Sequence, residues 1–191
     1  QGFEGTNGNW FVGGSNPTWA VGTPSGSSIN AAGSGTDSWV TNLGGVYNPL
    51  ENSYVESPCF DFTGMTNPTI QFKYISDCEP FNSVLGFDGV VLEYSTNGGY
   101  LWTQLGNLGD TAFWYNYSNV WALTNINVGA IGNGNGWSGL SAGWVTTGMF
   151  MPGLANETNV KFRFRFASDD YNYATFEGFG FDDVLIYNDV E

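Results

Sequence analysis

The sequence predicts an all-β fold: a two-sheet antiparallel β-sandwich, or jelly roll, with long loops rich in Gly, Asn and Trp. Helical periodicity is almost absent, and the segments between turn residues alternate apolar with polar side chains. The 28 Gly and 17% aromatic residues are typical of short strands joined by tight turns. A chain of 191 residues suits one all-β domain with a buried core. We therefore expect residues 1–191 to form a single module.

The first half of the chain contains two expected strands. Residues 53–62 (SYVESPCFDF) are divided by Pro58, which predicts an edge strand or a bulge, because proline cannot donate to a strand ladder. Residues 69–75 (TIQFKYI) alternate without interruption, with Ile70, Phe72 and Tyr74 on one face. The segments 5–36 and 107–145 are expected to be long and irregular.

A hairpin and two further strands are expected in the rest of the chain. Residues 89–106 predict a hairpin around Asn97-Gly98-Gly99, because these residues tolerate positive φ. Residues 159–169 place three phenylalanines on the core face and Lys161, Arg163 and Arg165 on the other. We expect these three bases to pair with some of the acids. Residues 178–187 (GFGFDDVLIY) form the last expected strand.

The charge excludes several classes of function. The chain has 18 acidic and four basic residues, no histidine and a net charge of −14, which argues against binding nucleic acid or an anionic membrane surface. No apolar stretch approaches the roughly 20 residues of a membrane span, so no membrane insertion is expected. Without histidine, neither a Ser/His nor a Cys/His constellation can exist, and we predict that the chain is not an enzyme.

Cys59 and Cys78 are the two cysteines of the chain. They can form one disulfide or remain free thiols in a reducing compartment. Because each lies near the end of an expected strand, and those strands are successive, we favour an extracellular disulfide. The first residue, Gln1, is consistent with a module excised from a larger extracellular protein.

The adjacent Asp182 and Asp183 interrupt an apolar strand, where an unpaired carboxylate costs several kcal/mol. Their side chains point to opposite faces, so the inward one needs an arginine of the 159–169 strand or a bound metal. Glu4 is the other charged residue in an apolar setting. Oxygen ligands without His or Cys suit Ca²⁺. The residues alone leave a salt bridge and a calcium site equally open.

Several stretches together resemble a known module. They are GFEGTNGNW (2–10), YVESPCFDFTGMTNPTIQFKY (54–74), DGVVLEYSTNGGYLW (88–102), and VKFRFRFASDD (160–170) with GFGFDDVLIY. They look like the MAM-like or cleaved-adhesin jelly roll of secreted and cell-surface proteins in gliding Bacteroidota. The opening and closing stretches are also similar to calcium-binding jelly-roll carbohydrate-binding modules. The resemblance covers nearly the whole chain, although each motif is short and degenerate.

The resemblance implies a structural calcium ion that joins the two terminal strands. Glu4 and Asp182 match its ligand pattern, and loop oxygens near Asp37 would complete the shell. An Arg163 or Arg165 partner for Asp183 is the second possibility. The resemblance also implies export by type IX secretion and a location outside the cell or on its surface.

Aromatic loops are the candidate binding surface. Residues 113–121 (FWYNYSNVW) contain Trp114, Tyr115, Tyr117 and Trp121, and residues 132–144 add Trp137. Sugar C–H faces stack on such rings while neighbouring amides bind hydroxyls. The alternative is that these rings anchor the loops to the sandwich. We select Trp114, Tyr115, Tyr117 and Trp137 as candidate ligand-binding residues.

These observations predict a non-catalytic, calcium-stabilised adhesion or recognition module. Its expected partner is a glycan or polysaccharide, or another cell-surface protein. The alternatives are a structural spacer or protein-interaction domain of a long adhesin or filament, and an accessory module of a secreted hydrolase. The acidic residues Asp169, Asp170 and Glu177 are interpreted as a solvated loop or as a second calcium site.

Overall fold

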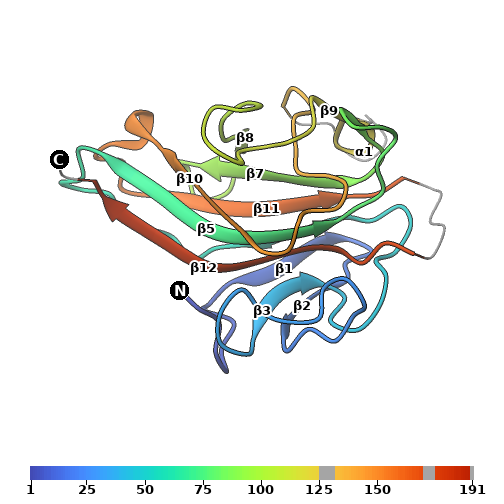
Figure 1. The fold of residues 1–191 in the computed structure, drawn as a ribbon. Helices are drawn as coiled ribbons and strands as arrows, with labels where there is room; N and C mark the ends of the chain where they lie inside the picture. The colour runs from blue at the N-terminus through green and yellow to red at the C-terminus, as the bar shows by residue number, and fades with distance from the viewer. Residues whose placement is uncertain (125–131, 170–174, 190–191) are drawn as a thin grey trace.

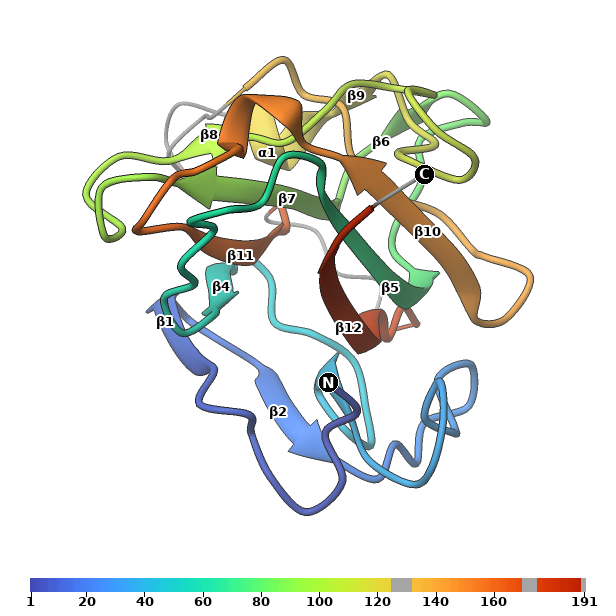
Figure 2. The same ribbon diagram turned by 90° about the vertical axis from the view of Figure 1, so that its left-hand side faces the viewer.

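The computed structural model describes residues 1–124, 132–169 and 175–189, and it confirms the predicted sandwich (Figure 1). Two five-stranded antiparallel sheets face each other, and Figure 2 shows them as two layers. The first sheet has the order β1 (Phe11–Ser15), β4 (Asn52–Glu56), β11 (Lys161–Ala167), β7 (Gly89–Ser95) and β8 (Thr103–Gln104). The second has the order β10 (Val145–Phe150), β5 (Pro68–Asp77), β12 (Gly178–Asn188), β3 (Ser38–Thr41) and β2 (Trp19–Gly22).

Small elements lie outside the two main sheets. A parallel pair joins β6 (Leu85–Gly86) to β9 (Asn119–Val120), and the short helix α1 (Trp121–Thr124) follows β9 directly. A 3₁₀ turn spans Pro152–Leu154. In the described ranges, no helix has the length and apolar character needed to cross a membrane.

The alternating segments form the sheets as predicted. In β5, Ile70, Phe72 and Tyr74 are buried. β7 and β8 pair as the expected hairpin, with Gly98 and Gly99 at positive φ in the turn. Of the two alternatives predicted for 53–62, an edge strand or a bulge, the edge strand is wrong, because β4 lies between β1 and β11. The ladder is interrupted around Pro58 and resumes as a single bridge beyond it.

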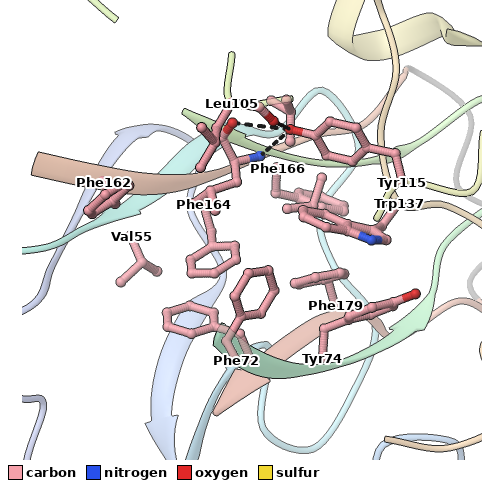
Figure 3. Close-up of a cluster of buried hydrophobic side chains, with 14 of the residues drawn as sticks. Val55, Phe72, Tyr74, Leu105, Tyr115, Trp137, Phe162, Phe164, Phe166 and Phe179 are labelled. Carbon is pink, nitrogen blue, oxygen red and sulfur yellow. Dashed lines mark hydrogen bonds between the residues drawn. The ribbon is translucent and has the colours of Figure 1, made fainter. Parts of the chain in front are cut away.

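The core fills the space between the sheets with aromatic rings (Figure 3). Phe164 of β11 stacks on Phe181 of β12, with ring centroids 4.0 Å apart, and this contact joins the two layers. Phe72 meets the same Phe164 edge to face at 5.0 Å. Both arrangements are favourable for aromatic pairs. Because β11 alternates, the Phe164 ring lies between the two sheets and packs against rings of the second sheet.

The outer face of the first sheet holds the basic stripe, and the predicted pairing with acids is confirmed. Lys161 Nζ lies 2.8 Å from Glu56 Oε1. Arg163 Nε and Arg165 Nε lie 2.5 and 3.3 Å from the two carboxylate oxygens of Glu93. Glu93 is fully buried, so one carboxylate neutralises two neighbouring guanidinium groups.

The predicted disulfide is absent, and both cysteines are free thiols. Cys59 is exposed and its Sγ contacts Asn159, beside the start of β11. Cys78 is buried and its Sγ contacts the carbonyl of Gly178, at the start of β12. The prediction is wrong because the two cysteines lie at opposite ends of the sandwich. The seven residues of β11 alone span about 20 Å, far beyond the reach of a disulfide.

Candidate functional site

The predicted ligands at the N-terminus bind a loop of the protein itself. The Glu4 carboxylate accepts hydrogen bonds from the N–H groups of Thr36 and Asp37 and from the Thr36 hydroxyl. These bonds lower the pKa of Glu4, the Asp37 N–H contributing most. The Asp37 carboxylate accepts from the N–H of Gly5 and the hydroxyl of Thr23. The two side chains therefore fasten the 33–37 loop to the start of the chain.

The adjacent aspartates lie at a β-bulge in β12, where the register to β5 shifts after Asp182 and Asp183 has a φ of 51°. The bulge gives the two side chains different environments. Asp182 is fully buried and accepts from the N–H groups of Ser34 and Asp183. Asp183 is partly exposed and its Oδ2 lies 2.9 Å from Lys73 Nζ.

The partner of Asp183 is thus Lys73, and the expected pairing with Arg163 or Arg165 is wrong. Both arginines lie on the other sheet, bound to Glu93. Burial raises the pKa of Asp182, against the two N–H donors that favour its ionised form.

The predicted calcium ligands do not converge on one point. A Ca²⁺ ion is surrounded by six to eight oxygens at about 2.3–2.6 Å, so opposite ligands lie within about 5 Å of each other. Among the described residues, one group of three acids has carboxylate oxygens that all lie within 4.8 Å of one another. This group does not contain Glu4, Asp37 or Asp182. The assignment of these three as calcium ligands stays a prediction.

That group consists of Glu79, Asp88 and Asp169, here called the acidic cluster. Each contributes a carboxylate oxygen within 4.8 Å of the others, and all three residues are buried. The cluster lies where β5 and β11 end and β7 begins, at the right in Figure 1. Asp88 Oδ1 accepts from the N–H of Asp169, and its Oδ2 accepts from the Tyr47 hydroxyl at 2.6 Å. These three residues could hold a metal ion.

The cluster is electrostatically unfavourable as it stands. Burial raises the pKa of Asp88 to about 7, and the charges of Asp169 and Glu79 add to this effect. Burial and Asp169 also raise the pKa of Glu79. Oε2 of Glu79 is buried and has no hydrogen-bond partner among the described residues. Three carboxylates in low dielectric therefore favour either bound protons or a bound cation.

The acids that precede the last strand have different roles in the structure. Asp169 belongs to the acidic cluster, whereas Asp170 lies outside the described residues. Glu177 is buried and its carboxylate accepts from the N–H groups of Ser27, Ser28 and Ile29. Glu177 is therefore not a solvated loop residue; it ties the 26–29 loop to the start of β12.

The four candidate ligand-binding aromatics are core residues, and the prediction that they form a surface is wrong. Exposed fractions are 0% for Trp114 and Trp137, 3% for Tyr115 and 8% for Tyr117. The polar ring atoms are also occupied: Trp114 Nε1 donates to the Leu105 carbonyl, and the Tyr115 hydroxyl lies 2.8 Å from the same oxygen. A sugar can reach neither the faces nor the polar edges of these rings.

The exposed aromatic rings lie elsewhere. Trp121, in the same predicted stretch, is 47% exposed, and Phe81, which is not among the predicted binding residues, is 61% exposed. Both line a hollow of about 230 Å³, here called the aromatic hollow. Its lining is completed by Leu85, Gly86, Phe87 and Asn119. Phe81 follows a proline in a short polar loop, which is the one feature of the sequence that could have indicated an exposed ring.

A second hollow, of about 310 Å³, lies near the N-terminus beside β12. Its walls include Trp10 and Phe62, both 1% exposed, and Leu185, which is 49% exposed. Phe60 also lines this hollow and is partly buried, so none of its three rings is as exposed as Phe81 or Trp121. The aromatic hollow is therefore the better candidate for a sugar.

Comparison with solved structures shows the same fold in binding modules and adhesin domains. The carbohydrate-binding module TmCBM61, solved in complex with β-1,4-galactotriose, matches with a TM-score of 0.55 at 12% identity, over 98% of this chain and 94% of that one. The K1 cleaved adhesin domain of Lys-gingipain from Porphyromonas gingivalis W83 matches with a TM-score of 0.54 at 14% identity, over 100% and 97%.

The K2 cleaved adhesin domain of Lys-gingipain matches with a TM-score of 0.50 at 20% identity, over 98% of this chain and 97% of that one. No family model and no curated protein matches the sequence. At these identities the likeness establishes the fold. The chain thus has the jelly-roll fold of cleaved adhesin domains and of a carbohydrate-binding module, as its motifs predicted.

Proposed function

We propose that the chain is a non-catalytic recognition module of a secreted or cell-surface protein and that it binds a glycan in the aromatic hollow. The observation that carries the proposal is the exposure of Phe81 and Trp121 in a molecule that otherwise buries most of its large rings. Exposure of apolar rings to water is unfavourable, and apolar rings gathered around a concave surface mark a binding site.

The composition of the hollow favours a sugar. Phe81 and Phe87 meet edge to face with centroids 5.3 Å apart, which gives the wall a fixed shape. Trp121 supplies a further ring, and the exposed amide of Asn119 can bond a hydroxyl. The shared fold with a galactotriose-binding module supports this class of ligand.

Alanine at Trp121 is expected to weaken glycan binding about tenfold or more without lowering the melting temperature. The ring is a half-exposed wall of the hollow, so its loss removes a stacking face but leaves the core intact. Titration calorimetry against a panel of oligosaccharides that includes β-1,4-galactotriose, in calcium buffer, measures the change.

Tyr100→Ala is the matched control, because Tyr100 is an 85% exposed aromatic residue on the β7–β8 hairpin, outside the hollow. It should leave the affinity unchanged. If both variants bind as the wild type does, the glycan site lies elsewhere. If a folded wild-type protein binds no glycan, the spacer and protein-interaction alternatives take precedence.

A further inference from the structure

We infer that the acidic cluster of Glu79, Asp88 and Asp169 binds a hard divalent cation, calcium first, and that this ion fixes the loop that forms the aromatic hollow. The cation site is argued from the cluster alone. Its effect on glycan binding rests on the proposed function.

The geometry of the cluster fits such an ion. Three carboxylate oxygens, two from the ends of the 79–88 loop and one from the residue that follows β11 by two positions, lie within 4.8 Å of one another, the spread that ligands around one Ca²⁺ ion require. Oε2 of Glu79 is the independent indication of a ligand. It is buried in a residue that is 8% exposed, and the described part of the chain offers it no hydrogen-bond partner. A buried carboxylate oxygen without a donor is rare, because its desolvation is then uncompensated.

No basic side chain is available to neutralise the cluster. The sequence contains four Lys and Arg residues and no histidine, and all four bases lie in described segments. Each pairs with a carboxylate outside the cluster. The pairs are Lys73 with Asp183, Lys161 with Glu56, and Arg163 and Arg165 with Glu93. Positive charge that offsets the three buried carboxylates can therefore come only from solution, as bound protons or as a bound cation.

The cluster holds the base of the 79–88 loop, which carries four of the six residues of the aromatic hollow. The Glu79 carbonyl accepts from the N–H groups of Phe87 and Asp88 at 3.0 and 3.2 Å. Further along the loop, the N–H of Phe81 donates to the Leu85 carbonyl at 2.9 Å. A cation that joins the side chains of Glu79 and Asp88 therefore clamps both ends of the loop. It removes the repulsion that would otherwise open it.

Melting curves in EDTA and in calcium test the site. At about one hundred times Kd, calcium is expected to raise the wild-type melting temperature by about 5–10 °C. Glu79→Gln should lose this increase, while in EDTA it should melt no lower than the wild type, because it removes one of three like charges. Glu157→Gln, which removes one acid away from the cluster, should keep the increase.

Two results would overturn the cation site: a wild-type protein that calcium does not stabilise, and a Glu79→Gln variant that gains as much as the wild type. Loss of the increase in Glu4→Gln instead would place the ion at the terminal strands.

Tb³⁺ luminescence provides a second readout that does not depend on the variant folding. The Tyr47 hydroxyl lies 2.6 Å from Asp88, so Tyr47 should sensitise the bound ion, and Ca²⁺ should quench the emission by competition.

The coupling to the hollow has a separate outcome. For the wild type, affinity for the oligosaccharide of the panel that binds most tightly should fall at least fivefold in EDTA. In Glu79→Gln the same affinity should not depend on calcium. If calcium stabilises through Glu79 but glycan affinity is the same in EDTA, the ion does not organise the loop. If no glycan binds while calcium still stabilises, the proposed function fails and the cation site stands.

Discussion

Replacement of Trp137 by alanine is expected to lower the free energy of unfolding by about 3–5 kcal/mol. The ring is 0% exposed and meets Tyr115, Tyr74 and Phe72 with centroids 4.5, 5.3 and 5.6 Å away. Its Nε1 donates to the Phe113 carbonyl, which would keep only the longer bond from the Tyr74 hydroxyl at 3.3 Å. Because these neighbours are held by both sheets and by the covering loops, they cannot close the resulting cavity.

Urea unfolding measures the change, and Trp137→Phe provides a milder variant that should lose less if the alanine variant does not fold. Trp121→Ala is the matched control, a tryptophan replaced at a half-exposed position, and should change the free energy of unfolding by about 0.5 kcal/mol or less. The opposite pattern, a stable Trp137→Ala protein that has lost glycan binding, would return Trp137 to the binding surface.

The strand alternation explains why the fold could be predicted. In residues 69–75 and 159–169 each apolar side chain has a polar neighbour, so the sequence itself assigns the faces of β5 and β11. The place of β4 within its sheet could not be predicted the same way. Its neighbours β1 and β11 are distant in sequence, and the pairing depends on how the whole chain closes.

The candidate sites were predicted less well, because burial in loops follows no local period. Trp114 and Trp137 lie in Gly- and Asn-rich segments typical of exposed loops, but these segments fold back over the sheet, where Trp137 bridges Val90 of β7. Asp88 and Asp169 of the acidic cluster are separated by 81 residues, so no spacing reveals that they meet.

The second large effect is expected at Glu93, where glutamine should cost about 3–5 kcal/mol of stability. The carboxylate is 0% exposed and is bound by Arg163 and Arg165. The Arg163 guanidinium is held in place by the rings of Trp102 and Tyr54, 4.3 and 4.8 Å from its centre. An amide at position 93 would leave two neighbouring buried cations without a counter-charge, and its own N–H₂ group would oppose their donors.

Urea unfolding of Glu93→Gln and of Lys73→Gln compares the loss of a buried ion pair with the loss of a partly exposed one. The Lys73–Asp183 pair is about one-third exposed, so its loss should cost roughly 1 kcal/mol or less. The triple change Glu93→Leu, Arg163→Met and Arg165→Leu should recover most of the stability that Glu93→Gln loses, because no buried charge then remains unpaired. If Glu93→Gln costs no more than Lys73→Gln, water reaches these arginines and the outer face is not sealed. A cost of several kcal/mol with recovery in the triple variant would show that Glu93 is required chiefly because the two arginines are present.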